Sequence, residues 1–383
     1  MRLDQCNNTA DFRRLAKKRL PAPIFHYMDG GSDDESTLRR NTQAFDDVDL
    51  VPDVLAGVEN VDLSTKVFGK RLEMPIFFSP TAMQRLFHHE GERAIAAAAR
   101  EFGTLFGVST IGTRSIEELG AINDAPKLFQ IYVHNDPALT SDLIARCKAA
   151  NFDALALTVD TIVAGNRERD LVTGMTTPPK LTPASVLSFL WHARWTAGYL
   201  LRERFDLPNV SAYITAGSGV SSSVAAYIDS QMKRSIDWDD AGRMIGEWGK
   251  PFAIKGVMSV DDARRAVDIG ASAIMISNHG GRQLDGSRAP FDQLAAIVDA
   301  VGGRIEIILD GGIRRGTHVL KALATGANAC SGGRMYLYAL AAGGTAGVMR
   351  AMRLMRAEIE RDMLLMGCRT VAELDRSKLA KRP

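Results

Sequence analysis

Short apolar runs recur along the chain, and each ends at a turn residue or at the start of a helical pattern. Runs of this kind, rich in β-branched residues, are typical of parallel strands that are buried on both faces. We count eight of them, at residues 74–80, 105–110, 127–133, 154–160, 252–257, 273–278, 305–312 and 327–333. Amphipathic helix patterns lie between most of these runs, for example at residues 91–102, 138–151, 259–270, 291–301 and 316–326.

The alternation of strand and helix predicts an α/β fold with a parallel sheet. Eight units favour a closed TIM (β/α)8 barrel over about 74–340, because a doubly wound open sheet would more often have fewer strands and a glycine-rich loop after the first. The sequence after Pro80 reads Thr81-Ala82-Met83-Gln84 and contains no such loop. We therefore expect residues 1–383 to form a single barrel domain.

Three segments fall outside the repeating pattern. Residues 10–65 predict an N-terminal extension of short helices and turns, which would close the barrel floor or flank the rim of an active site. Residues 343–366 have the pattern of a long amphipathic helix. Residues 161–237 separate the fourth and fifth runs by far more than the other crossovers need, so we interpret this insertion as a lid or a docking segment.

The composition narrows the class of protein. Hydrophobic residues make up 46% of the chain and charged residues 24%, which excludes global disorder. The net charge is only +2 and both signs are interspersed, so we expect no nucleic-acid partner. The four cysteines form no CxxC pair, which speaks against a zinc site or a disulfide framework. Residues 13–19 are strongly charged where a signal peptide would be apolar, and a cytoplasmic location is expected.

Polar residues fall at or just after the ends of the predicted strands, where barrel enzymes carry their active sites. They are Ser109, Gln130, Tyr132, Thr158, Asp160, Lys255, Ser277, His279, Asp310 and Arg334. A random scatter of polar residues would not follow the strand ends so regularly. The pattern therefore predicts one functional face on the barrel.

The loops after the last two strands carry the signature of a phosphate site. Asp310-Gly311-Gly312-Ile313-Arg314 follows the seventh strand, and Gly332-Gly333-Arg334 follows the eighth. Glycine amides and a helix N-terminus commonly bind phosphate at this place in a barrel, and arginines neutralise its charge. The alternative interpretation is two tight turns with surface arginines.

Lys255 indicates what the phosphate could belong to. A lysine at a strand end inside a barrel is costly unless it is paired with negative charge, and beside a flavin ring it would stabilise the anionic reduced form. Ser109, Gln130 and Thr158 offer hydrogen bonds suited to the edge of such a ring. A Schiff-base lysine or a structural ion pair are the alternatives, and a sugar-phosphate isomerase would use the same glycine loops.

His279 and Arg282 stand three residues apart after the sixth strand. A proton acceptor beside a guanidinium that grips a carboxylate suits chemistry alpha to an acid group. Arg167 would supply the second arm of that grip, and Arg169 would equally serve as an exposed partner of Asp170. A lone histidine is more often structural, so its place at a strand end carries the argument.

The chain resembles a known family in the motifs SNHGGRQLD, LDGGIRRG, PTAM, FQIYV, LTVD and YMDGG. Together they are similar to those of the FMN-dependent L-2-hydroxy acid dehydrogenases and oxidases, which include glycolate oxidase, the bacterial flavin L-lactate dehydrogenases and mandelate dehydrogenase. The resemblance spans about residues 11–369. It implies FMN as the cofactor and no metal.

The resemblance also implies a role for each matching residue. His279 would take the hydroxyl or alpha proton of the substrate, with Asp160 and Asp310 as electrostatic partners and Asp160 as the one expected to orient the base. The substrate-binding residues would be Tyr27, Tyr132, Arg167 and Arg282. The residues in contact with FMN would be Pro80, Thr81, Ala82, Ser109, Gln130, Thr158, Lys255, Ser277, Asp310, Gly311, Gly312, Arg314, Gly333 and Arg334.

Two positions depart from glycolate oxidase, where a tryptophan is replaced by Ile111 and a leucine by Ala164. The smaller side chains imply room for L-lactate, whose product is pyruvate, or for a longer or aromatic acid such as mandelate. Ala82 resembles the oxidases, which pass electrons to oxygen and produce hydrogen peroxide.

Within the insertion, residues 186–205 mix bulky apolar with basic side chains and suit an interfacial helix rather than a spanning one. Similar segments occur in the membrane-associated, quinone-linked dehydrogenases of the family, although an active-site lid or a subunit contact would also explain them. We favour a dehydrogenase with a quinone or cytochrome as acceptor, peripheral on the inner face of the cell membrane, and we expect a homotetramer.

Overall fold

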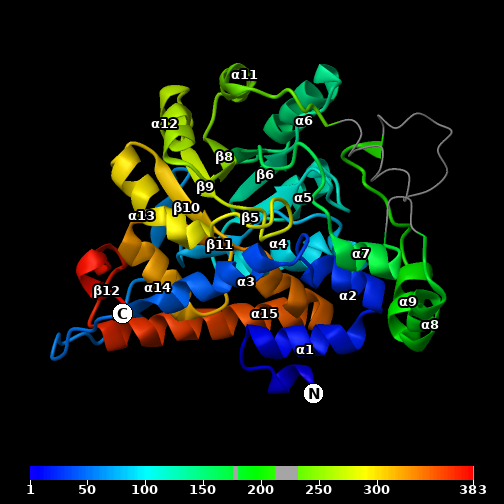
Figure 1. Cartoon of the computed structure of the whole chain (residues 1–383), viewed down its shortest axis with the longest axis horizontal. Helices are drawn as coiled ribbons and strands as arrows, with labels where there is room; N and C mark the ends of the chain where they lie inside the picture. Colours follow the sequence, from blue (N-terminus) through cyan, green and yellow to red (C-terminus); the bar gives the residue numbers. More distant parts are fainter. Residues whose placement is uncertain (176–179, 212–231, 383) are drawn as a thin grey trace.

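The computed structural model describes residues 1–175, 180–211 and 232–382 (Figure 1). Its centre is a closed barrel of eight parallel strands in sequence order, with the last strand pairing with the first. The strands are β4 (Ile76–Phe78), β5 (Phe106–Ser109), β6 (Lys127–Ile131), β7 (Ala154–Thr158), β8 (Phe252–Val257), β9 (Ala273–Ile276), β10 (Glu306–Asp310) and β11 (Ala329–Gly332). Each falls inside one of the eight apolar runs, so the predicted TIM barrel is confirmed.

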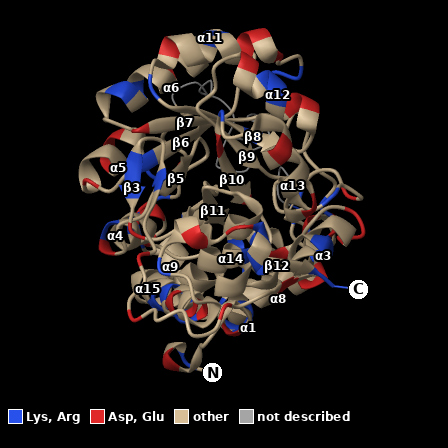
Figure 2. Ribbon diagram, turned by 90° about the vertical axis from the view of Figure 1, so that its left-hand side faces the viewer, with Lys and Arg blue, Asp and Glu red and all other residues tan. Residues whose placement is uncertain are grey.

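Helices surround the barrel, and Figure 2 shows both signs of charge spread over their outer faces. They are α4 (Glu92–Glu101), α5 (Ile116–Ile122), α6 (Pro137–Ala149), α11 (Trp238–Trp248), α12 (Val260–Asp268), α13 (Pro290–Val301) and α14 (Gly316–Thr325). Several begin where a side chain caps the first turn: Ser115, Asp237 and Ser259 each accept a hydrogen bond from a backbone amide three residues on. The apolar stripe of each helix covers the strands.

The long helix α15 (Arg334–Met366) begins nine residues before the predicted start at Gly343. It bends at Gly343 and Gly344, and Gly344 has a φ of +57°. The sequence pattern did not reveal the helix at residues 334–342, because its side chains are buried on nearly all sides and so show no amphipathic pattern. They form the eighth helix of the barrel, and the predicted helix is the part beyond the bend.

The N-terminal extension contributes α1 (Thr9–Arg19), α2 (Ala22–Asp29) and α3 (Ser36–Gln43). In Figure 1, α1 lies along α15, while α2 and α3 lie beside the barrel. The expectation that this extension flanks the rim is correct, since Tyr27 and Met28 line the cavity described below.

The barrel floor is closed by a hairpin that the sequence did not predict. It consists of β2 (Thr65–Val67) and β3 (Lys70–Leu72), whose Val67, Phe68 and Leu72 are buried in the lower barrel interior. Its strands are only three residues long and carry charges, which hides them from pattern analysis. A further pair, β1 (Val48–Leu50) and β12 (Leu379–Lys381), joins residues near the two ends of the chain.

The described part of the insertion forms α7 (Glu168–Thr173), α8 (Pro183–Trp191) and α9 (Ala193–Leu200), at the right of Figure 1. Short 3-10 helices complete the elements: η1 (Leu3–Gln5), η2 (Ala44–Asp47), η3 (Gln84–Leu86), η5 (Val371–Glu373) and η6 (Arg376–Lys378). In the described ranges, no helix is both long and apolar enough to cross a membrane. The rest of the insertion lies outside the described residues.

Candidate active site

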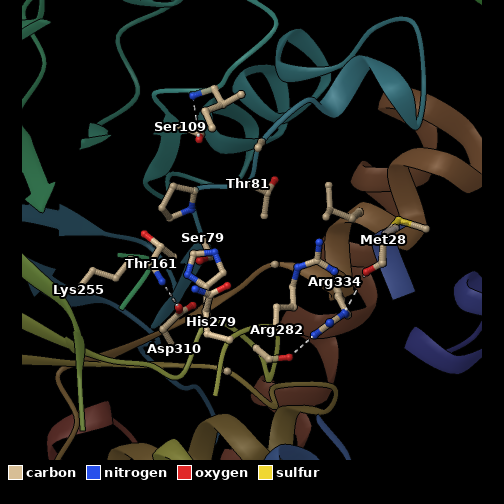
Figure 3. Close-up of a pocket in the computed structure, with 18 of the residues that line it drawn as sticks. Met28, Ser79, Thr81, Ser109, Thr161, Lys255, His279, Arg282, Asp310 and Arg334 are labelled. Carbon is tan, nitrogen blue, oxygen red and sulfur yellow. Dashed lines mark hydrogen bonds and ion pairs between the residues drawn. The ribbon is translucent and has the colours of Figure 1, made fainter. Parts of the chain in front are cut away.

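A cavity opens at the carboxyl ends of the barrel strands, with loops from most of the strands in its wall (Figure 3). It brings together most of the residues singled out from the sequence: Tyr27, Pro80, Thr81, Ala82, Ser109, Ile111, Tyr132, Ala164, Arg167, Lys255, His279, Arg282, Asp310, Gly311, Gly312, Arg314, Gly333 and Arg334. Four others are not in its wall but lie behind it or in contact with it: Gln130, Thr158, Asp160 and Ser277.

Lys255 and Asp310 form a buried ion pair on one side of this cavity. The distance from Lys255 Nζ to Asp310 Oδ2 is 2.9 Å, and Ser277 and Ser331 donate hydrogen bonds of 2.8 and 2.7 Å to the same carboxylate. Burial by itself would lower the pKa of Lys255, but the attraction of Asp310 and then Asp160 outweighs it and raises that pKa. Lys255 therefore stays protonated at the strand ends, with Asp310 as its counter-charge.

His279 lies at the centre of the close-up, between the Lys255 pair and Arg334 (Figure 3). Its Nδ1 is 3.1 Å from Oδ1 of Asp160, so Asp160 rather than Asp310 contacts the ring. The residue has a φ of +57°, a left-handed conformation that costs energy in any residue except glycine. Such strain is often found at functional sites. The other imidazole nitrogen remains available for a proton from the substrate.

The guanidinium groups of two arginines lie over the ring of Tyr27 in the same cavity. The guanidinium carbons of Arg282 and Arg167 lie 5.1 and 5.5 Å from the Tyr27 ring centre. Arg282 is fixed because it donates to the carbonyl oxygens of Tyr27 and Gly30 at 2.7 and 2.9 Å. Burial, and then the charge of Arg167, lower the pKa of Arg282 to about 10. Two converging cations are prepared for an anion such as a carboxylate.

The pairing expected of Arg169 is wrong. Arg169 forms ion pairs with Asp29 and Glu35. Asp170 instead lies 3.5 Å from Nε of Arg167. Because α7 lies against α2, Arg169 reaches the end of α2 and helps to hold the rim of the cavity.

The two glycine loops form the predicted cationic cradle. Gly311 and Gly312 have φ values of +130° and +77°, and a Cβ on Gly312 would collide with the carbonyl of Asn41. Arg334 is held by the carbonyl oxygens of Met28, Gly280 and Gly30 at 3.1, 2.7 and 2.7 Å. Arg314 is partly buried, desolvation lowers its pKa, and it forms no ion pair with a described residue. An anionic phosphate would supply the missing partner.

The residues present fit FMN. Nε2 of Gln130 and Oγ1 of Thr158 are buried and have no hydrogen-bond partner among the described residues. Leaving such groups unpaired costs free energy, so a ligand with complementary polar atoms is implied. Oε1 of Gln130 is already bound by Ser109 at 3.2 Å, which leaves only the donor end for a ligand. The edge of the flavin ring would be held there, and its phosphate would lie in the glycine cradle.

Sequence reasoning missed two supporting residues. The hydroxyl of Tyr336 donates to the Ser79 carbonyl at 2.7 Å and lies 2.6 Å from Oγ1 of Thr81, which fixes the loop after β4. Ser331 supports Asp310 from the next strand. Tyr336 lies in the apolar first part of α15, where its hydroxyl is the only sign of a polar role in the sequence. Ser331 contacts Asp310 because of the register between neighbouring strands, which the pattern of apolar residues does not reveal.

Comparisons with known proteins agree with this geometry. Residues 16–381 match the family model described as FMN-dependent dehydrogenase. The chain is 39% identical to glycolate oxidase of Spinacia oleracea over 98% of this chain and 96% of that protein. It is also 39% identical to L-lactate oxidase of Nostoc sp., with 97% of each covered.

Among solved structures, the monotopic membrane protein (S)-mandelate dehydrogenase superposes with a TM-score of 0.94 at 32% identity, over 99% of this chain and 100% of that one. These matches identify an FMN-dependent enzyme and exclude the sugar-phosphate isomerase that was the alternative. The chain belongs to the FMN-dependent dehydrogenase family, and it is an FMN-dependent enzyme that oxidises 2-hydroxy acids.

Proposed function

We propose that this enzyme oxidises an L-2-hydroxy acid with an apolar side chain, L-lactate to pyruvate in the first place, and passes the electrons to a membrane quinone. The observation that carries the substrate proposal is the composition of the cavity wall near His279. Ile111, Ala164, Met83 and Val163 all line the cavity that holds His279 and the two arginines. Glycolate has no side chain to bury there, whereas each buried methyl or methylene group contributes about 0.8 kcal/mol.

The roles of the residues follow from their positions. Arg282 and Arg167 would bind the substrate carboxylate. Burial, with the nearby Asp160, raises the pKa of Tyr132, so its hydroxyl stays protonated as a donor to substrate oxygen. His279 would accept the proton of the substrate through the nitrogen that faces the cavity, and Asp160 would stabilise the resulting imidazolium. FMN supplies the capacity to accept two electrons.

The acceptor and the location are proposed from the outer face of α8 and α9. Trp191 and Leu201 are each 84% exposed, and Leu187, Leu190 and Leu200 are also exposed. Isolated exposed apolar residues are common, but a cluster of this kind marks a contact surface. The similar mandelate dehydrogenase is a monotopic membrane protein, which supports a membrane as the contact. We therefore propose a peripheral enzyme on the inner face of the cell membrane. The homotetramer stays a prediction.

A second candidate substrate is (S)-mandelate. The similarity to (S)-mandelate dehydrogenase extends over the whole chain, and the aliphatic wall suits an aromatic ring as well as a methyl group. This candidate shares the base, the carboxylate grip and the acceptor with the first. The two candidates differ only in how much of the space beside Ile111 and Ala164 the substrate side chain fills.

A double-mixing experiment tests the proposal. The enzyme is reduced without oxygen by L-lactate, (S)-mandelate or glycolate, and the bleaching of the flavin absorbance gives the reduction rate for each acid. The reduced enzyme is then mixed with oxygen or with a short-chain quinone. We expect L-lactate to reduce the flavin fastest and quinone to reoxidise it faster than oxygen. Fastest reduction by glycolate would contradict the substrate proposal, and faster reoxidation by oxygen would make the enzyme an oxidase.

A further inference from the structure

A second cavity lies between the insertion and the barrel, outside the site described above. Its volume is about 800 Å³, within the range of small-molecule sites. Its wall is formed by α9, the end of α1 and the segment 85–89. We call it the basic cavity, because Lys18, Arg19, Arg85, Arg194 and Arg202 all line it.

The lining of the basic cavity offers donors and aromatic faces but few acceptors. Besides the five cations, three histidines and the rings of Trp195, Tyr199 and Phe205 belong to its wall. Trp195 and Tyr199 stack with ring centres 5.2 Å apart. Among the described residues that line it there is no aspartate or glutamate. A ligand that fits this wall accepts hydrogen bonds and has a flat or apolar body.

The cations of the basic cavity have no direct carboxylate partner in the described part of the chain. None of the five forms an ion pair with another described residue. Arg85 donates instead to the carbonyl oxygens of Glu203 and Arg204. Burial, followed by the charge of Arg194, lowers the pKa of Arg19. This unbalanced positive potential stabilises any ligand that gains negative charge.

A metal ion is a poor occupant. Ligand atoms of His88, His89 and Glu90 lie within 4.8 Å of one another, which is a possible metal cluster. However, the Glu90 carboxylate already accepts hydrogen bonds from the amide and hydroxyl of Thr345 at 2.6 and 2.7 Å. The surrounding arginines would also repel a cation. The same groups favour a neutral or anionic acceptor of hydrogen bonds.

The basic cavity shares a wall with the flavin cavity. Phe87 lines both, and its ring stacks on Tyr27 with centres 6.4 Å apart. Trp195 holds this wall in place, because its indole nitrogen donates to the Leu86 carbonyl at 2.9 Å. On the outer side, the exposed Trp191 and Leu201 belong to the lining. The basic cavity therefore connects the proposed membrane surface with the wall of the flavin site.

We propose that the basic cavity binds the head group of the quinone that reoxidises the reduced flavin. This inference rests on the proposed quinone acceptor and names its site. The ring would lie among Trp195, Tyr199 and Phe205, its carbonyl oxygens would accept from the arginines and histidines, and its tail would leave past Trp191 and Leu201. The anionic reduced flavin gives up two electrons and one proton, and a second proton comes from solvent. The quinone becomes a hydroquinone and the flavin returns to its oxidised form.

Gly198 allows a clean test. It lines the basic cavity, and a Cβ built on it meets no atom within 4 Å, so Gly198→Phe adds a ring to that cavity from an unobstructed Cβ. Gly246 on α11 is also helical with no atom within 4 Å, and Gly246→Phe is the matched control. Reoxidation of the reduced enzyme by a short-chain benzoquinone should be at least about tenfold slower in Gly198→Phe. Reduction by the hydroxy acid serves as the internal reference.

Binding is measured separately from turnover. Trp191 and Trp195 line the basic cavity, so the same benzoquinone should quench tryptophan fluorescence saturably in the wild type and in Gly246→Phe but not in Gly198→Phe. The double substitution Arg194→Gln with Arg202→Gln should weaken quinone binding severalfold.

Each remaining outcome overturns the inference in a distinct way. If quinone reoxidises Gly198→Phe as fast as the wild type, the basic cavity is not the quinone site. Quinone would then still be the proposed acceptor. Absence of quinone reduction in the wild type overturns both. Unchanged quinone kinetics together with lost binding of Gly198→Phe to acidic vesicles would make the occupant a lipid phosphate.

Discussion

The flavin cavity and the basic cavity differ in how far their charged side chains are paired. In the flavin cavity Lys255 is paired with Asp310, and His279 with Asp160. Arg282, Arg314 and Arg334 of the same cavity form no ion pair with a described residue, and they would bind the substrate carboxylate and the cofactor phosphate. In the basic cavity all five cations lack such a partner. Paired charges orient reacting groups, whereas unpaired ones mark where a ligand brings its own charge or acceptors.

The largest effect on the flavin cavity is expected from replacing the base, His279. His279→Gln should slow the reduction of the flavin by the hydroxy acid by about 10³- to 10⁴-fold, because general-base catalysis contributes on that scale. The variant should keep its flavin absorbance, since the residues expected to hold FMN are unchanged. Stopped-flow reduction without oxygen gives the rate. A rate within a few-fold of the wild type would assign the proton transfer to another group.

The next largest effect concerns the two arginines that lie over the Tyr27 ring, Arg282 and Arg167. Arg282→Met should lower kcat/KM for the hydroxy acid by about 10²- to 10³-fold, which corresponds to the loss of a buried charged contact of roughly 2–5 kcal/mol. Arg169→Met is the control, because Arg169 binds Asp29 and Glu35 rather than the cavity. Equal losses in the two variants would mean that Arg282 supports the rim and not the substrate.

A smaller effect is expected from the residue that orients the base. Asp160→Asn keeps the size of the side chain but removes the charge beside Nδ1 of His279. Flavin reduction should slow by about 10- to 100-fold, the usual cost of losing a supporting partner. The loss should fall on kcat rather than on KM. Asp310→Asn would differ, because it removes the partner of Lys255 and should weaken FMN binding.

The smallest effect tests the outer face of the insertion. Leu190→Ser with Trp191→Ser should reduce partition into vesicles by roughly tenfold, since each side chain loses only part of its transfer free energy. Leu364→Ser with Leu365→Ser is the matched control on the far end of α15, at the opposite end of the molecule in Figure 1. Equal loss in both pairs would show that the vesicles bind apolar residues without preference.

Much of the barrel was readable from sequence because buried parallel strands are continuous apolar runs and their ends collect polar groups. Lys255, His279 and Asp310 were found in this way. What pattern missed depends on contacts between distant residues. The hairpin at Val67 has no period to detect, and the true partners of Arg169 lie at the end of α2 and just before α3.

The basic cavity shows the same limit. Its residues come from segments that lie far apart in the chain: Arg19 and His88 are 69 positions apart, and His88 and Trp195 are 107 apart. Only the fold brings them together. The sequence indicated a mixture of bulky apolar and basic residues at 186–205, but it did not indicate the basic cavity between them and the barrel.

The most direct test of the central claim, that the flavin cavity alone performs the oxidation, is the rate of flavin reduction without oxygen by L-lactate and by L-lactate deuterated at carbon 2. The rate is measured with and without vesicles that contain no quinone, because quinone would reoxidise the reduced flavin during the measurement. Deuterium should slow the reduction, because the bond to that hydrogen breaks in the cavity that holds His279, and vesicles should leave the rate unchanged. A rate that is insensitive to deuterium but changes with vesicles would contradict the account.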